Sequence, residues 1–184
     1  MKTRLSALAL ALGLTFLVPL HVAANTASDA APQRGLYING VIAAQTAGGV
    51  TVPVAGTTSK GGKFVGNFRI RRFDVVNNQV VAVGTLTGTI QNAAGNVIGT
   101  VLRTISLVTT ITGASCEILH LELGPLDLNL LGLEVHLNRI VLDIDADPTG
   151  GLLGALLCAV ANLLNIGGPL ADIAALLNQI LALL

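Results

Sequence analysis

The sequence predicts an α+β fold: an antiparallel β-meander, forming a sheet or a partly open barrel, with a C-terminal helical hairpin packed on it and one disulfide. Three observations predict it. A leucine-rich unit of seven residues repeats four times from Leu119. Upstream, stretches rich in Val, Ile and Thr are separated by short turns. After Gly150 the apolar residues change to helical spacing.

The N-terminal residues 1–24 are predicted to be an export signal. Lys2 and Arg4 precede an almost wholly apolar run, and Val22-Ala-Ala supplies the small residues that a signal peptidase needs. An uncleaved membrane anchor is the alternative, but the run is short for a span. We expect an exported protein, periplasmic or extracellular, with a flexible leader at 25–34 and a single β-rich domain at 35–184.

The meander is predicted from runs of β-branched residues that end at turn residues. Asn77-Asn78 and the segment 93–96 have turn composition. Short turns between strands of similar length favour antiparallel pairing. The expected strands are residues 35–43, 63–73, 80–90 and 97–112, with a loop at 57–62.

The leucine repeat fits either strands or a helix. Positions one, three and five of each unit are apolar, and leucines spaced alternately by four and three residues also form a coiled-coil seam. We favour strands because Gly124-Pro125 and Gly132 would interrupt a helix. A helix would also turn Leu121 and Leu128 away from the seam, whereas strands bury all three apolar positions on one face.

The repeat unit has seven residues, which is an odd number. In one continuous strand, the apolar positions of successive units would therefore lie on opposite faces of the sheet. The chain must therefore turn or bulge near residues 124–125, 131–132 and 138–139. If it folds back at residue 128, His120 lies opposite His136 and Glu122 lies opposite Glu134.

Residues 151–184 are predicted to form the helical hairpin. Leu156, Leu157 and Val160 follow helical spacing, and Pro169 suits the first turn of a second helix. Each apolar segment carries Asn or Asp and is shorter than about 18 residues, so we expect no transmembrane segment in the mature chain.

The two cysteines, Cys116 and Cys158, are expected to form a disulfide, as an isolated pair does in an exported protein. Two buried free thiols are the alternative. The apolar surroundings of Cys158 argue against a reactive thiol.

Charge is divided unevenly along the chain. Residues 25–115 hold seven Lys and Arg against two acids, and residues 116–184 hold one Arg against eight acids. Attraction between the halves within one fold is the favoured explanation, and a basic face for an anionic envelope partner is the alternative. Scarce aromatic residues and few basic ones argue against nucleic acid.

The best site candidate is the set His120, Glu122, Glu134 and His136. Two imidazoles and two carboxylates on one sheet face are suitable zinc ligands, and an exposed polar face is the alternative. Asp143, Asp145 and Asp147 faintly resemble a calcium loop but lack its glycine and distal glutamate. No other cofactor is expected.

A basic cluster, Arg69, Arg71 and Arg72, is a candidate anion site, with a solvated or salt-bridged face as the alternative. The chain has no phosphate-binding loop, dinucleotide fingerprint or nucleophile elbow. We therefore assign no catalytic residue.

The segment CEILHLELGPLDLNLLGLEVHLN from Cys116, with GLLGALLCAV from Gly151 and VVAVGTLTG from Val80, resembles a group of exported bacterial proteins. The resemblance implies a bacterial, extracytoplasmic protein and carries no activity.

Three functions are therefore considered. The first is an exported, non-catalytic binding or structural protein of the bacterial envelope or extracellular space, acting on an envelope partner. The second is a carrier of an apolar, lipid-like ligand held between sheet and hairpin. The third is a metal-dependent enzyme built on the His and Glu set.

Overall fold

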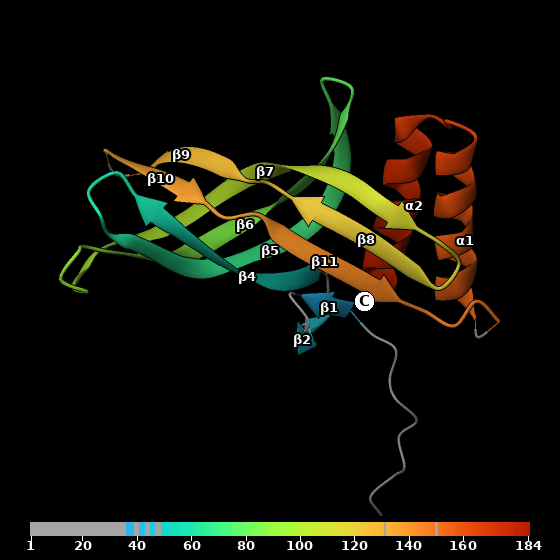
Figure 1. The fold of residues 1–184 in the computed structure, drawn as a ribbon, viewed down its shortest axis with the longest axis horizontal. Helices are drawn as coiled ribbons and strands as arrows, with labels where there is room; N and C mark the ends of the chain where they lie inside the picture. Colours follow the sequence, from blue (N-terminus) through green and yellow to red (C-terminus); the bar gives the residue numbers. More distant parts are fainter. Residues whose placement is uncertain (1–35, 39–40, 43–44, 47–48, 131, 150) are drawn as a thin grey trace, which may run out of the picture. The chain divides into compact units, whose positions relative to one another are not determined.

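The computed structural model describes residues 36–38, 41–42, 45–46, 49–130, 132–149 and 151–184, with side chains from residue 49 onward. The chain divides into the units Met1–Pro32 and Gln33–Leu184, and every described residue belongs to the second. The expected signal and leader lie outside the described residues. The second unit is a curled antiparallel sheet with a helical hairpin (Figure 1), which confirms the predicted fold class.

In the described residues, eleven strands form the sheet in the order β2-β1-β11-β8-β7-β6-β5-β4-β10-β9, with β3 beside β4. Strands β4 to β8 are a meander in chain order, and the later strands add to both of its edges. The strands are β1 Leu36–Ile38, β2 Val41–Ile42, β3 Gln45–Thr46, β4 Gly49–Thr58, β5 Lys63–Val76, β6 Gln79–Gln91, β7 Val97–Ala114, β8 Ile118–Leu123, β9 Leu126–Leu130, β10 Leu133–Leu137 and β11 Ile140–Asp145.

The strands expected at 63–73, 80–90 and 97–112 are confirmed as β5, β6 and β7, and the one expected at 35–43 is found as the short strands β1 and β2. Asn77 and Asn78 form the turn between β5 and β6, with φ of 50° and 58°. Asparagine tolerates this left-handed conformation, which suits a tight hairpin turn.

Strand β4 was missed by the sequence analysis, because Pro53 and Gly56 hide its alternating valines. Proline cannot donate to a β-ladder and is tolerated where a strand has a free edge. Pro53 lies opposite Asn67 of β5. On the other edge, the register with β10 covers only residues 56–58 and that with β3 only residues 49–50.

The inner face of the meander is built around two phenylalanines of β5, Phe64 and Phe68, which are both fully buried. A Cβ atom on Gly88 would lie 2.6 Å from the ring of Phe64, and one on Gly84 would lie 2.8 Å from the ring of Phe68. The glycines of β6 therefore leave space for both rings against the sheet backbone.

The leucine repeat forms four strands, β8 to β11, and the breaks fall at the predicted places, 124–125, 131–132 and 138–139. We call residues 118–145 the leucine ribbon. The apolar positions of its units face the core, with Leu119, Leu121 and Leu123 fully buried. The prediction of strands rather than a helix is confirmed.

The predicted register of the repeat is wrong. Strand β8 pairs with β11, so Leu121 lies opposite Leu142, and β9 pairs with β10, so Leu128 lies opposite Val135. Units one and four pair, as do units two and three, with the same offset. Both registers have the same centre, between residues 131 and 132, so the ribbon is one long fold-back in which β8 also pairs with β7 and β10 also pairs with β4.

The predicted helical hairpin is confirmed as α1, Leu152–Asn165, and α2, Leu170–Leu183, with Pro169 at the N-cap of α2. Asn178 of α2 fixes the hairpin to the sheet. Its Oδ1 accepts from the Phe73 N–H at 2.7 Å, and its Nδ2 donates to the Phe73 carbonyl at 2.9 Å. Because β4 pairs with β5 only up to Ile70, the asparagine amide covers an edge that β4 leaves open.

Candidate functional site

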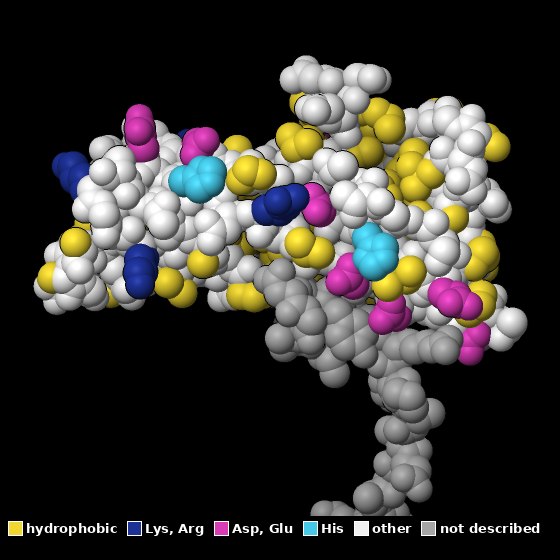
Figure 2. Space-filling model, in the orientation of Figure 1, with side chains coloured by type: hydrophobic (Ala, Val, Ile, Leu, Met, Phe, Trp, Pro, Cys, Tyr) yellow, Lys and Arg dark blue, Asp and Glu magenta, His cyan; other side chains and the backbone are white. Residues whose placement is uncertain are grey.

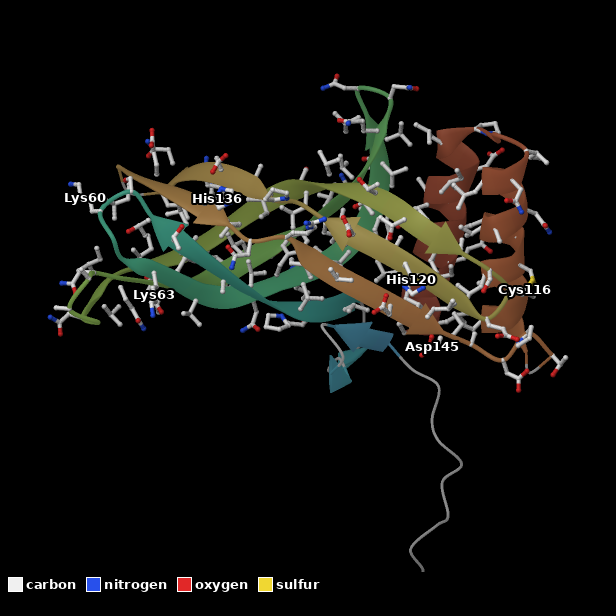
Figure 3. The ribbon with its side chains drawn as sticks, in the orientation of Figure 1. Lys60, Lys63, Cys116, His120, His136 and Asp145 are labelled. Carbon is white, nitrogen blue, oxygen red and sulfur yellow. A yellow bond between two sulfur atoms is a disulfide. The ribbon has the colours of Figure 1, made fainter. Side chains whose placement is uncertain are left out.

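The outward face of the leucine ribbon carries both histidines of the described chain. His136 lies towards one end and His120 towards the end near the helices (Figure 3). Figure 2 shows acidic side chains beside each histidine on this face. The arrangement follows from the repeat, because positions two and four of each unit point away from the core.

Each histidine binds an aspartate across a strand pair. His120 Nδ1 of β8 lies 2.5 Å from Asp143 Oδ1 of β11, and His136 Nδ1 of β10 lies 2.6 Å from Asp127 Oδ1 of β9. Both bonds join position two of one unit to position four of its partner unit. The sequence analysis missed both aspartates as partners, although 131–132 was among the predicted turn positions: a fold-back there places these positions opposite each other.

The structure does not bring His120, Glu122, Glu134 and His136 together. The first two lie on β8 and the others on β10, which are not neighbours in the sheet. Glu122 Oε2 instead accepts a bond of 2.7 Å from Arg139 Nη1. In the part of the chain that is described, no three His, Cys, Asp or Glu side chains are grouped so as to hold a metal ion. The prediction of a zinc site depended on these four side chains lying close together, and the structure separates them.

The three aspartates considered for calcium have different surroundings. Asp143 binds His120, and Asp145 is paired in the ladder opposite Ile118. Asp147 Oδ1 accepts bonds from the Thr149 backbone N–H and hydroxyl at 3.0 and 2.8 Å, which form a local turn. Two of the three carboxylates thus have protein donors at hydrogen-bond distance.

The arginine cluster lies at the β-bulge of β5, between Ile70 and Arg72. Arg71 Nε donates to the Thr85 hydroxyl at 3.1 Å, and Arg72 Nε lies 3.5 Å from Asp74 Oδ2. Arg69 has its Nε buried. These contacts fit the salt-bridged alternative better than a convergent anion site. The ion pairs Arg72–Asp74 and Arg139–Glu122 each join residues of the same half of the chain, so they lend no support to attraction between the halves.

The predicted disulfide is present between Cys116 and Cys158. Cys116 immediately precedes β8 and Cys158 lies on α1, so the bond ties the helical hairpin to the start of the leucine ribbon. Neither cysteine has a free thiol. The disulfide fits an oxidising compartment.

The space between the sheet and the hairpin is nearly filled. A cavity of about 10 Å³ lies between α2 and the inner sheet face, beside Leu121, Leu142 and Leu177. That is about the space of one water molecule. An acyl chain therefore has no room beneath α2 in this conformation.

A larger space, an open groove of about 260 Å³, lies at the turn between α1 and α2. We call it the hairpin groove. One side is the β5–β6 turn and strands β6 and β7, and the other is the ends of both helices. Its described lining residues are Asn78, Gln79, Val80, Val108, Thr109, Thr110, Ile111, Leu164, Leu170 and Ile173.

Comparison with protein-family models, curated proteins and solved structures finds no match to this chain. The resemblance to exported bacterial proteins stays a prediction. None of the helices among the described residues has the length and apolar character needed to cross a membrane.

Proposed function

We propose that this chain is an exported, non-catalytic binding protein of the bacterial envelope or extracellular space. The hairpin groove is the observation that carries the proposal, because it is the kind of concave, mostly apolar surface that binds small molecules. The disulfide holds one wall of the groove in place through α1.

The ionisable side chains of the ribbon bond to one another. His120 Nδ1 and His136 Nδ1 lie at hydrogen-bond distance from aspartates, and Glu122 accepts a bond from Arg139. These contacts fit the polar outer face of a half-buried hairpin, and we assign no catalytic role to them.

A second candidate is a carrier of an apolar small molecule. The expected place, beneath the hairpin, offers only about 10 Å³, whereas the hairpin groove offers about 260 Å³. We therefore place the ligand of a carrier at the edge of the hairpin, beside the turn between the helices. The groove, at about 260 Å³, is slightly smaller than the usual range of small-molecule sites, about 300–1,000 Å³, and so suits a small ligand.

Native mass spectrometry of the mature protein after export to the periplasm tests the proposal. The expected result is a complex that loses a small organic molecule on denaturation and a chain whose two cysteines are joined. Protein purified without the export signal, from the cytoplasm, is the control. If the protein instead loses a metal ion on denaturation, and the native sample has hydrolytic activity, a non-catalytic role would be contradicted.

A further inference from the structure

The hairpin groove opens where the sheet splits. The last register pair between β6 and β7 is Val81 with Val108. Beyond it, β7 continues along β8, with Thr109 opposite Leu123, while β6 turns back into β5. The C-terminal end of α1 and the N-terminal end of α2 lie over this split. In Figure 1 the β5–β6 turn stands next to the turn between the two helices.

The walls of the groove are apolar. Val80 and Val108 come from the sheet, and Leu164, Leu170 and Ile173 come from the two helices. Val108 is 41% exposed, so the apolar surface reaches the solvent. Figure 2 shows hydrophobic side chains gathered on the surface between the protruding turn and the helices. A ligand with an apolar body would remove this surface from water.

A buried hydroxyl lies in the lining of the groove. Thr109 is only 6% exposed, and its Oγ1 contacts the Leu107 carbonyl of its own strand at 3.4 Å. This is long for a bond between a hydroxyl and an oxygen, which is usually 2.5–3.0 Å. The hydroxyl therefore has capacity for a better partner. A ligand oxygen that reaches it would gain a hydrogen bond in a place with little water.

The electrostatic character of the groove indicates which head group a ligand would have. The described lining residues include amides, hydroxyls and apolar side chains but no charged residue. The acid of the first turn of α2, Asp172, is exposed to solvent and does not line the groove. A carboxylate or phosphate would be desolvated against the apolar walls without a cation in the described lining, which is unfavourable. A neutral head group with hydroxyls meets the amides of Asn78 and Gln79 at no such cost.

From this geometry we propose that the hairpin groove binds a neutral single-chain amphiphile, with its alkyl chain against the helix ends and a hydroxyl or carbonyl oxygen bonded to Thr109. The proposal rests on the carrier form of the proposed function and adds the ligand class and the group that recognises it. The chemistry fits a fatty alcohol or a monoacylglycerol better than a fatty acid.

Isothermal titration of the mature, oxidised protein with monolaurin, laurate and dodecyltrimethylammonium tests the ligand class, because the three probes differ in head-group charge. Monolaurin should bind at least about tenfold more tightly than either charged probe. Equal affinity for all three would overturn the proposal, since it would indicate a non-selective apolar surface. Absence of monolaurin binding would overturn it too.

Matched variants locate the site. Thr109→Val keeps the shape and removes the hydroxyl, so monolaurin affinity should fall about 3- to 10-fold. Thr104→Val, on the exposed face of the same strand, should leave it unchanged. Val108→Asp places a charge at the rim and should abolish binding, whereas Leu102→Asp, at an exposed position outside the groove, should not. Wild-type affinity in both groove variants would overturn the assignment.

The experiments distinguish failure of the proposed binding function from failure of the hairpin groove as its site. If native mass spectrometry finds an organic ligand that survives both Thr109→Val and Val108→Asp, the protein is a binding protein but the hairpin groove is not its site. If no organic ligand is found and monolaurin does not bind, the carrier function and the groove assignment both fail. Thermal unfolding of each variant, compared with wild type, separates loss of binding from loss of fold.

Discussion

The two strand pairs of the leucine ribbon share one repeat and one pairing offset but differ in burial. In β8–β11 all six apolar positions are buried, whereas in β9–β10 half of them are buried and half, Leu126, Leu128 and Leu133, are only partly buried. The β8–β11 pair lies between β7 and β1 and faces α2. Among the described strands the β9–β10 pair is joined to the sheet through β4, and β9 is the last strand in the order.

The outer edge of β9 is protected by a side chain instead of a strand. Arg103 Nη1 of β7 donates to the Asn129 carbonyl of β9 at 3.1 Å. Charged side chains at a sheet edge discourage pairing with another chain. Identical local sequence patterns therefore acquire different stabilities from their neighbours, and equivalent positions in the two pairs act as controls for each other.

Loss of the disulfide should have the largest effect. The double variant Cys116→Ser, Cys158→Ser opens a loop with a sequence separation of 42. The chain-entropy model gives a loss of about 4 kcal/mol in the free energy of unfolding, measured by urea denaturation. Hydrogen exchange should speed up in β8 and β11 before β9 and β10. Equal changes in both pairs would contradict the idea that the hairpin stabilises one pair selectively.

The next effect should come from the third position of the repeat. Leu121→Ala removes a fully buried side chain and should cost about 3 kcal/mol, whereas Leu128→Ala, at the equivalent partly exposed position, should cost about 1 kcal/mol. Chemical denaturation of the two variants measures the difference. Similar losses would show that burial by α2 does not distinguish the two pairs.

A smaller effect is expected from the helix that covers β8–β11. Asn178→Ala leaves the N–H and carbonyl of Phe73 without their side-chain partner and should cost about 1–2 kcal/mol. Gln179→Ala, at an exposed neighbouring position, is the control and should be nearly neutral. If the two variants unfold at the same denaturant concentration, the asparagine does not hold the hairpin on the sheet.

The histidine pairs should show the smallest difference. The side chains of His120 and Asp143 are 41% and 29% exposed, and those of His136 and Asp127 are 52% and 83% exposed. Because exposed pairs are worth little, His120→Ala should cost about 1 kcal/mol and His136→Ala about 0.3 kcal/mol. Double-mutant cycles with Asp143→Ala and Asp127→Ala isolate each pair, and a larger coupling energy at His136 would reverse the expected order.

Much of the secondary structure could be predicted because its signals are local. The odd repeat required breaks at 124–125, 131–132 and 138–139, and the strands end there. Pro169 marked the start of the second helix. Strand β4 was missed because Pro53 is disfavoured in a strand with two neighbours, and only the registers with β3 and β10, which cover residues 49–50 and 56–58, show that the described pairing on that edge leaves out Pro53.

The candidate sites were less predictable, because each depends on which strands become neighbours. A fold-back at residue 128 would have joined His120 with His136, whereas the observed fold-back between residues 131 and 132 gives each histidine an aspartate instead. Both arrangements bury the same leucines, so the hydrophobic pattern does not choose between them. No local sequence pattern predicts the hairpin groove, since its walls come from strands β6 and β7 and helices α1 and α2, which are far apart in the chain.

The sequence by itself determined the classes of the elements, the core-facing positions of the leucine ribbon, the helical hairpin and the cysteine pair. These follow from periodicity, turn residues and composition, which act over a few residues. Only the tertiary structure decided the pairing of the repeat units, the burial of equivalent leucines and the position of the groove. Pairing between distant strands is set by the total burial of the whole sheet and hairpin, which no local segment encodes.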